Sequence, residues 1–355
     1  MWDVLVAGAG PAGALAAFVL ARAGWQVLLI DEIWMDKYKV GESLLGAARQ
    51  ILQSLDLLSI LESGSHLLNY GNVSAWGTDQ LVANDFINDP RGLGWHLDRV
   101  EFDESLRLAA CYAGAVLWRN RVKSVTDMNS IWRIVLKDRE VSARWFIDAT
   151  GRAASLARSQ GAIRRRDLPL FATYRWVVAS DDDTETRTFV EAVPNGWWYS
   201  ARLPRQTRVI IFHTDAQKAT DIRRQPDLWE VYLEETRYIC HLLGGVTYTD
   251  SPHVIEAGGG YLNNFAGPQW IVAGDAALIF DPISSQGIFN ALYTGMKAGQ
   301  AVHAALIGDL SGVDAYIERL KAIRAAYCRH YSLIYRSENR WADKSFWALR
   351  YKSLV

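Results

Sequence analysis

The sequence predicts an α/β protein of two intertwined domains, in which an antiparallel sheet is inserted into a fold of alternating strands and helices. The chain opens with a strand, a glycine turn, a helix and a second strand over residues 2–32. Residues 171–212 follow a strand-like pattern throughout, and residues 270–277 return to a strand followed by a glycine turn. Because strand-helix-strand units form parallel sheets and consecutive short strands favour antiparallel ones, these patterns indicate two different sheets.

The first unit contains V-L-V-A-G-A-G-P-A-G at residues 4–13. This places G-x-G-x-x-G between a strand and a helix, as a dinucleotide site requires. The glycines allow a tight turn, approach of the backbone to a pyrophosphate, and close helix packing, while a carboxylate after the next strand can bind ribose hydroxyls. The alternative is an ordinary glycine-rich turn. We predict a Rossmann-like dinucleotide site formed by Gly8, Gly10, Ala12, Gly13, Asp31 and Glu32.

Helical and strand-like patterns alternate through the next part of the chain. Apolar residues recur at helical spacing over residues 43–61 and 101–113, so both segments should be helices. Residues 67–89 hold short aromatic and β-branched pieces between turn residues, as expected of strands. Further strands are expected at 116–125, 131–136 and 143–147, the last followed by a turn at 148–151.

The second half of the chain begins with the antiparallel sheet, which should lie over a ligand. A helix is expected over residues 226–243, and long helices over 286–307 and 314–337. The aromatic tail that follows is interpreted as helical core contact, with partner docking as the alternative. The strands expected in this half are residues 173–179, 186–192, 197–203, 208–213, 253–257 and 270–273.

Composition excludes several classes of protein. The net charge of -1 argues against nucleic-acid binding, because phosphate contacts normally require a basic surface, and the run Arg164-Arg165-Arg166 is expected to be a solvated turn. The three cysteines are far apart and lack metal-ligand spacing, so we predict neither a disulfide framework nor a metal site. No stretch approaches the roughly 20 apolar residues that span a bilayer. We expect a cytoplasmic protein without a membrane span.

The glycine motif does not separate NAD from FAD, so distant segments must decide. Residues 40–43 read V-G-E-S, residues 97–103 contain L-D-R and F-D, and residues 146–151 read F-I-D-A-T-G. Residues 274–292 begin with G-D-A and contain D-P-x-x-x-Q-G-I. Together these motifs resemble the FAD-dependent monooxygenase and halogenase superfamily over most of the chain. The resemblance implies FAD as cofactor, with Asp275 on the ribitol and residues 281–288 beside the isoalloxazine.

The resemblance implies further cofactor contacts. A helix that begins near Gln286 would aim its N-terminal N–H groups at the flavin N1 and C2 carbonyl, where negative charge gathers on reduction. Arg99 is expected near the phosphates or ribose, and Glu42 in the loop that returns over the cofactor; surface or helix-end pairing is the alternative for both. The cofactor residues expected in this way are Glu42, Ser43, Arg99, Val122, Gly151, Asp275, Gln286, Gly287 and Ile288.

These assignments divide the chain into three parts. The FAD-binding domain is expected to be discontinuous, whereas the C-terminal residues form a helical segment. The predicted limits are 1–65, 92–165 and 258–310 for the FAD-binding domain, 66–91 and 166–257 for the substrate domain, and 311–355 for the helical segment.

Two residues are candidates for catalysis. Related monooxygenases have a proline where oxygen meets the reduced flavin, so the resemblance implies this place for Pro282, with an ordinary loop proline as the alternative. His96 could act as an acid or base in an aromatic pocket, because histidine titrates near neutral pH, and a structural histidine is the alternative. The substrate pocket is expected at Trp197, Trp198 and Tyr199, where strand alternation places the middle residue on the opposite face.

The function implied by the resemblance is hydroxylation of an electron-rich aromatic substrate through a C4a-hydroperoxyflavin. The motifs also resemble LodB-like flavoproteins, which modify a tryptophan of a partner oxidase during formation of a tryptophylquinone cofactor. The substrate is then a small aromatic molecule or a tryptophan of a partner protein, and the electron donor is a reduced nicotinamide or a flavin reductase. No second dinucleotide motif is evident that would identify the donor.

Three alternatives remain open. Tryptophan halogenases use a lysine after the G-E-S-like loop, but this sequence has none between Lys39 and Lys123, which disfavours halogenation. Geranylgeranyl reductase-like proteins share the nucleotide motifs but usually have a cysteine-containing loop where this chain has residues 39–43. Some proteins of this architecture bind prenylated partners without redox chemistry.

Overall fold

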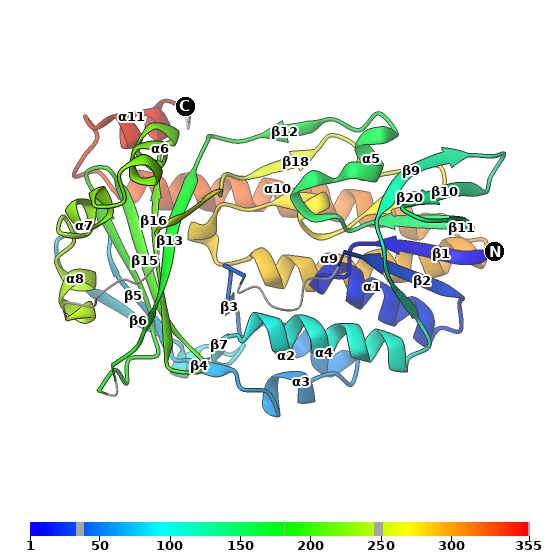
Figure 1. The fold of residues 1–355 in the computed structure, drawn as a ribbon, viewed down its shortest axis with the longest axis horizontal. Helices are drawn as coiled ribbons and strands as arrows, with labels where there is room; N and C mark the ends of the chain where they lie inside the picture. Colours follow the sequence, from blue (N-terminus) through cyan, green and yellow to red (C-terminus); the bar gives the residue numbers. More distant parts are fainter. Residues whose placement is uncertain (33–38, 181, 245–250, 354–355) are drawn as a thin grey trace.

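The computed structural model describes residues 1–32, 39–180, 182–244 and 251–353. Two bodies, each centred on a sheet, lie side by side along the long axis (Figure 1). The helices α9 (Gly287–Leu306) and α10 (Ser311–Ser337) run lengthwise, and α10 reaches from one body to the other. The mixed α/β fold with two sheets is therefore as predicted.

The first body contains an eight-stranded sheet with a parallel centre. Its main path is β19-β20-β11-β1-β2-β8, with β10 and β9 added as an antiparallel extension of β11. The centre of β1 is fully buried, as parallel strands covered on both faces require. The strands are β1 (Trp2–Ala7), β2 (Val27–Asp31), β8 (Val116–Arg119), β9 (Val122–Asp127), β10 (Trp132–Leu136), β11 (Glu140–Asp148), β19 (Ala266–Gly267) and β20 (Trp270–Val272). The single strand predicted at 116–125 is thus divided into β8 and β9.

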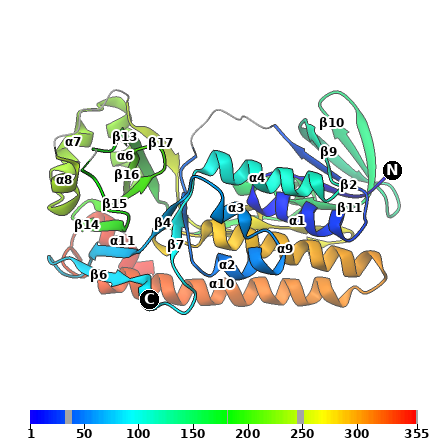
Figure 2. The ribbon, with the colours of Figure 1, turned by 90° about the horizontal axis from the view of Figure 1, so that it is seen from below.

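Helices pack in a layer against this sheet. The helix α1 (Pro11–Arg22) lies between α4 (Arg99–Tyr112) and α9, and α10 packs outside α9 (Figure 2). The predicted helix at 43–61 is wrong in its extent: it is replaced by β3 (Ser43–Leu44), α2 (Ala48–Ser54) and α3 (Ser59–Glu62). Asp56 has a φ of 61°, which ends α2, and Leu57 N–H turns back to the carbonyl of Leu52 at 2.8 Å.

The second body is a seven-stranded sheet with the order β17-β13-β16-β15-β14-β5-β6. The strands predicted within residues 171–212 pair antiparallel as expected, whereas β14 and β5 are parallel. Strand β5 comes from a distant segment and joins the sheet beside β14 without a hairpin turn. The strands are β5 (Gly71–Ala75), β6 (Val82–Asp85), β13 (Phe171–Val178), β14 (Thr188–Val193), β15 (Gly196–Leu203), β16 (Thr207–Thr214) and β17 (His253–Glu256).

The outer face of this sheet is covered by α6 (Ala216–Arg224), α7 (Leu228–Leu233) and α8 (Tyr238–Leu243). The single helix predicted at 226–243 is therefore broken. The buried carboxylate of Glu191 accepts hydrogen bonds from the N–H groups of Arg237 and Ile239 at 2.6 and 3.0 Å. A carboxylate at these free N–H groups stabilises the start of a new helix.

In the described part of the chain, two small sheets and four short 3₁₀ helices lie outside the two main sheets. The domain limits stay a prediction. The remaining elements are β4 (Leu67–Asn69), β7 (Gly94–His96), β12 (Arg164–Arg166), β18 (Gly260–Leu262), β21 (Leu278–Ile279), α5 (Ser155–Ser159), η1 (Phe86–Asn88), η2 (Gly151–Ala153), η3 (Gly274–Ala276) and η4 (Pro282–Ser284).

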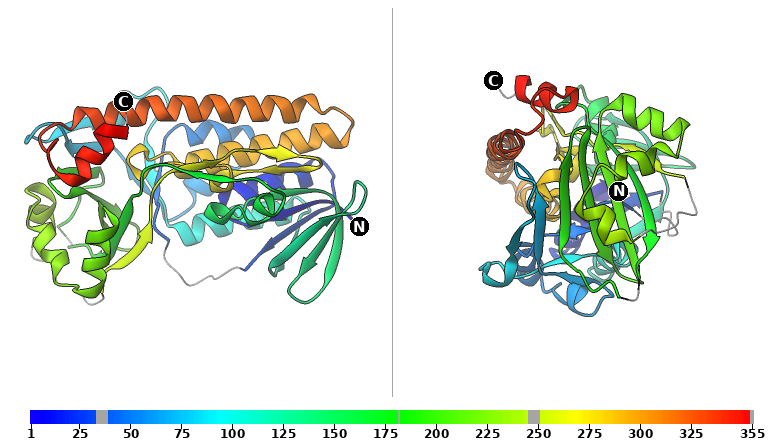
Figure 3. Two further views of the ribbon diagram at one scale, coloured as in Figure 1. Left: turned by 90° about the horizontal axis from the view of Figure 1, so that it is seen from above. Right: turned by 90° about the vertical axis from the view of Figure 1, so that its left-hand side faces the viewer.

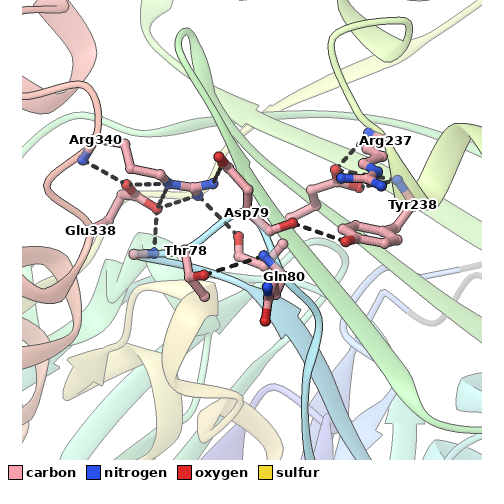
Figure 4. A network of polar contacts seen from close by, with 10 residues as sticks. Thr78, Asp79, Gln80, Arg237, Tyr238, Glu338 and Arg340 are labelled. Atoms are coloured by element: carbon pink, nitrogen blue, oxygen red, sulfur yellow. Dashed lines mark hydrogen bonds and ion pairs between the residues drawn. The ribbon is translucent and has the colours of Figure 1, made fainter.

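The C-terminal segment packs against the inner side of the seven-stranded sheet (Figure 3). In α11 (Ser345–Ser353), Phe346 and Trp347 are buried, and the indole N–H of Trp347 donates to the carbonyl of Val193 at 2.9 Å. A second attachment is made by buried Glu338, which accepts from Gly77 N–H at 2.6 Å and pairs with Arg340 at 2.6 Å; Figure 4 shows this pair. Core contact is thus the correct interpretation for the tail's buried aromatic residues.

Across the four described ranges, no helix combines the length and the apolar character that crossing a membrane would require.

Candidate functional site

A cavity of about 370 Å³ lies between the two bodies. Its one side is formed by η3, η4 and the start of α9, and its other side by the inner face of β13, β15, β16 and β17. This volume falls within the roughly 300–1,000 Å³ typical of small-molecule sites. Predicted cofactor residues that line the cavity are Gly10, Ala12, Glu42, Ser43, Arg99, Gly151, Asp275, Gln286, Gly287 and Ile288.

The glycine turn has the geometry of a dinucleotide site. Gly8 has a φ of 97°, in the region that favours glycine, and a Cβ at Gly13 would lie 1.8 Å from the carbonyl oxygen of Gly8. These two glycines therefore shape the turn from inside, although neither lines the cavity. A Cβ at Gly10 would meet nothing within 4 Å, so a ligand can approach the backbone there. The arrangement fits the pyrophosphate of a dinucleotide at the N-terminus of α1.

The two carboxylates after β2 differ in their surroundings. Asp31 accepts a hydrogen bond from the N–H of Ala9 at 2.6 Å, which ties the strand end to the glycine turn. Glu32 is exposed and lies 3.9 Å from Arg121. Val122, at the start of β9, does not line the cavity. Asp31 and Glu32 do not line it either, so a ribose contact of either carboxylate stays a prediction.

Arg99 and Glu42 both line the cavity. Glu42 is 2% exposed, and one oxygen accepts from the N–H of Gly41 at 2.9 Å. Burial raises the pKa of Glu42, whereas the Tyr199 hydroxyl, the N–H of Gly41 and, less strongly, Arg99 oppose that rise. Arg99 is itself held by Asp103 at 3.2 Å and donates to the carbonyl of Gly41. The ion pair at the helix end, which is the alternative interpretation of Arg99, is therefore present. Because this pair holds the guanidinium at the cavity, it is compatible with a contact to the cofactor.

Asp275 lies at the turn after β20, with three arginines around it. Burial raises its pKa, whereas Arg152, Arg164 and Arg99 counteract the rise. Arg164 donates to the carbonyls of Asp275 and Ala276 at 3.0 and 2.9 Å, and burial lowers its pKa to about 10. The expectation of a solvated basic turn is wrong for Arg164, because β12 pairs with β18 and directs this side chain under η3.

The start of α9 presents free N–H groups to the cavity. No side chain caps this end, its first turn carries no acidic residue, and Gln286 and Gly287 line the cavity. A Cβ at Gly287 would meet nothing within 4 Å, so a ring can approach the backbone. The helix terminus carries a partial positive charge that stabilises an anion beside it. Pro282 lines the same wall, at the start of η4.

The predicted substrate residues separate by strand alternation. Tyr199 lines the cavity, and Trp197, on the same face, stacks on His213 with ring centroids 3.6 Å apart. Trp198 points to the opposite face, where it packs on Phe212 and Trp229 under the outer helices. Of the three predicted pocket residues, Tyr199 alone lines the cavity: Trp197 lies behind His213, and including Trp198 needs correction because it faces the other side of the sheet. The Tyr199 hydroxyl lies beside Glu42, and burial, followed by the charge of Glu42, raises its pKa.

His96 is a buried structural residue in this arrangement. It is 0% exposed, does not line the cavity, and its Nε2 lies 2.8 Å from the hydroxyl oxygen of Thr188. Burial, followed by the charge of Arg208, lowers its pKa to about 4. The acid-base candidacy of His96 is therefore corrected to the structural alternative, because a neutral imidazole away from the cavity cannot reach a ligand there.

Two cavity residues escaped the sequence analysis as candidates for chemistry. Asp281 is 3% exposed and lines the wall beside Pro282; the D-P stretch contains it but gave no sign that its side chain faces inward. His213 is the penultimate residue of β16, and it lines the cavity because β15 and β16 pair in a register that sets it against Trp197. No local motif marks such a cross-strand pair.

Comparison with protein families gives two matches. A family model described as an FAD binding domain matches residues 1–43, and one described as tryptophan halogenase matches residues 83–350. The second match covers well over half of the chain. The FAD-binding region thus coincides with the strand, glycine turn and helix that open the sequence.

Individual relatives point in the same direction. The chain is 29% identical to the FAD-dependent oxidoreductase LodB of Marinomonas mediterranea, over 99% of this chain and 97% of that protein. Among solved structures, the flavin-dependent halogenase CmlS has a TM-score of 0.88 at 22% identity, covering 98% of this chain and 67% of that one. The peptidyl tryptophan dihydroxylase QhpG, essential for tryptophylquinone cofactor biogenesis, has a TM-score of 0.76 at 23% identity, covering 99% and 78%.

Proposed function

Because this chain belongs to the tryptophan halogenase family and is an FAD-dependent oxidoreductase, we propose that it hydroxylates an electron-rich aromatic ring. The preferred substrate is a tryptophan side chain of a partner protein. The observation that carries the proposal is the cavity, which sets the flavin-side wall of Pro282 and α9 opposite a sheet face that carries Tyr199, Ile211 and His213. Membership of an enzyme family removes the alternative of a non-redox prenyl binder.

The residues fit the cofactor that the family uses. Gly10 and the start of α1 suit the pyrophosphate, Asp275 the ribitol, and the uncapped start of α9 the ring. When FAD is bound and reduced, it supplies the activation of dioxygen. The chain's own contribution is to hold the ring against positive N–H groups, to orient the substrate and to limit access of water.

The lining of the cavity favours hydroxylation over halogenation. None of the described residues that line it is a lysine, in keeping with the lysine-free stretch between Lys39 and Lys123. The resemblance assigns the handling of hypohalous acid to such a lysine. Halogenation remains the second candidate, because the matched family and the similar structure of CmlS are halogenases.

A side chain of a protein can reach this cavity from the surface. Ile255 and Glu256, on the edge strand β17, line the cavity and are exposed, Ile255 by 41%. An exposed rim lets an extended chain pass along the edge while one aromatic side chain enters. The fold shared with QhpG and the relationship to LodB support a peptidyl tryptophan as substrate.

The test is incorporation of isotopic oxygen. The FAD-loaded enzyme is reduced chemically without oxygen and mixed with ¹⁸O₂, chloride, bromide and a tryptophan-containing peptide or free tryptophan. We expect the peptide to gain ¹⁸O, and free tryptophan to gain less. A halogen mass on the product would favour the second candidate, and a product without added oxygen or halogen would contradict both. The unreduced enzyme is the control. If the reduced enzyme instead saturated the chain of a prenyl substrate in the absence of oxygen, it would be a reductase.

A further inference from the structure

Asp281 is a buried carboxyl in the cavity wall that the function described above does not yet use. It precedes Pro282, is 3% exposed and lines the cavity. Its Oδ1 accepts a hydrogen bond from the N–H of Ile283 at 3.0 Å, and its own N–H donates to the hydroxyl of Tyr327 at 2.9 Å. Backbone and side chain are therefore both fixed, and the carboxyl has a defined place at the flavin-side wall.

The other carboxyl oxygen of Asp281 accepts a hydrogen bond from the hydroxyl of Tyr335. The indole N–H of Trp197 donates to the Tyr335 hydroxyl at 3.1 Å, and an indole N–H cannot accept in return. The single proton of the hydroxyl is therefore directed at Oδ2 of Asp281, also at 3.1 Å. Each carboxyl oxygen accepts one hydrogen bond, which suits an ionised carboxylate with lone pairs to spare. Tyr335 belongs to α10, so the C-terminal segment completes this arrangement.

The groups around Asp281 set its charge state. Burial raises the pKa of Asp281 to about 6, and Asp167 adds to the rise, whereas the Ile283 N–H, Arg350 and Tyr335 oppose it. The phenols on α10 that surround this carboxyl stay protonated, because burial first and the Asp281 charge second raise the pKa of each. These phenols are Tyr327, Tyr331 and Tyr335. Asp281 is thus the member of this group that changes charge near neutral pH.

Another titratable side chain of the cavity, on the sheet face opposite Pro282, is a poorer base. His213 stacks on Trp197, and its Nδ1 has no hydrogen-bond partner among the described residues. Burial, then the charge of Arg350, lowers its pKa to about 3. A proton delivered to such an imidazole would be lost at neutral pH. The Asp281 carboxylate holds a proton more strongly and has its orientation fixed by Tyr335 and Ile283.

We propose that Asp281 accepts the ring proton that the aromatic substrate loses on hydroxylation, with Tyr335 as its positioning residue. This inference rests on the proposed function. One atom of dioxygen joins a ring carbon as hydroxyl, two electrons come from reduced FAD, and the other atom leaves as water. The substituted carbon then carries both hydrogen and hydroxyl. Its C–H bond breaks, the electron pair returns to the ring, and the proton moves to the carboxylate, which later releases it to solvent.

The first test is the pH profile of ¹⁸O incorporation into the tryptophan-containing peptide by chemically reduced holoenzyme. The wild-type rate should fall as the pH drops through about 6, where Asp281 becomes protonated. Asp281→Asn should lose this limb and be about 100-fold slower at neutral pH, the lower end of general-base effects. Tyr335→Phe should move the limb to higher pH, because loss of a donor to the carboxylate raises its pKa.

Tyr316→Phe is the matched control. Tyr316 is also a buried tyrosine of α10, and its hydroxyl donates to the carbonyl of Val272 at 2.7 Å, away from the cavity lining. The variant loses one buried hydrogen bond but should keep the wild-type limb. A merely structural role of Tyr335 would likewise leave the limb in place, which would overturn its assignment.

A second readout does not depend on turnover. Infrared difference spectra of the FAD-free protein between acidic and neutral pH should contain the band of a protonated carboxyl that is absent in Asp281→Asn. Persistence of that band in the variant, or an Asp281→Asn enzyme with the wild-type limb and rate, overturns the proposal about Asp281. A wild-type enzyme that adds no oxygen to the peptide contradicts the proposed function instead, so the two failures are distinguishable.

Discussion

Arg99 and Asp103 form an ion pair across one turn of α4, with Nη2 of the arginine 3.2 Å from Oδ1 of the aspartate. The Asp103 side chain is 1% exposed and also pairs with Lys39 at 3.0 Å. Arg99 lines the cavity, whereas Asp103 does not. A buried carboxylate thus holds a guanidinium at the place where the resemblance expects the phosphates or ribose of FAD.

We expect Asp103→Asn to weaken FAD binding about tenfold, equivalent to about 1.4 kcal/mol, because Arg99 loses the charge that fixes its orientation. Titration of flavin fluorescence measures the dissociation constant. Asp309→Asn is the control, since this carboxylate caps Ser311 at the surface between α9 and α10. Equal affinity in wild type and Asp103→Asn would show that Arg99 does not depend on this partner.

The glycines of the turn should divide into structural and ligand-contacting positions. Gly13→Ala places a Cβ against the Gly8 carbonyl and should destabilise the FAD-free protein by roughly 1–3 kcal/mol, as overpacking does. Gly10→Ala meets no protein atom within 4 Å and has a φ of -72°, which any residue adopts. It should keep the unfolding temperature of the FAD-free protein but lose FAD affinity. Calorimetry with and without FAD separates the effects, and a destabilised FAD-free Gly10→Ala protein would contradict this division.

His96 should affect stability in acid rather than turnover. Its pKa is about 4 in the fold against an ordinary value of 6.5, so the unfolded chain binds the proton more readily between these values. Stability should therefore fall as the pH drops from 6.5 toward 4, with a slope from this group of at most about 1.4 kcal/mol per pH unit. His96→Gln should show a shallower acid loss in denaturant titrations. If His96→Gln kept its fold but hydroxylated the substrate much more slowly than wild type at neutral pH, the acid-base hypothesis for His96 would be restored.

The attachment of the C-terminal segment through Glu338 and Arg340 should be cooperative. Glu338→Ala leaves Arg340 and the N–H of Gly77 without their buried acceptor, and should cost roughly 1–3 kcal/mol in the free energy of unfolding. Adding Arg340→Ala to Glu338→Ala should lower the free energy of unfolding little further. The double-mutant cycle should therefore give a coupling energy of at least about 0.5 kcal/mol. Asp79→Ala, at the exposed end of the network, should cost less than about 1 kcal/mol. Strictly additive losses for the two main variants would show that they act separately.

Local sequence predicted the nucleotide fold because its geometry is encoded in neighbouring residues. The glycine turn, the helix after it and the strand ending at Asp31 follow from backbone requirements within about 30 residues of chain. The prediction is wrong where residues that are distant in the sequence make contact. Glu191 accepts from an N–H group at the start of α8, and the single helix predicted from periodicity is broken there. Strand β5 similarly joins β14 in parallel across the molecule.

The sequence by itself determined the α/β class and the dinucleotide turn, since these depend on motifs of fixed spacing, and its resemblance to a flavoprotein superfamily implied FAD. Only the tertiary structure decided which side chains face the substrate side. Packing placed Trp198 under the outer helices, sheet register set His213 against Trp197, and α10 placed Tyr335 on Asp281. The physical reason is that strand alternation limits each side chain to one of two faces, whereas pairing and packing across long separations decide what that face meets.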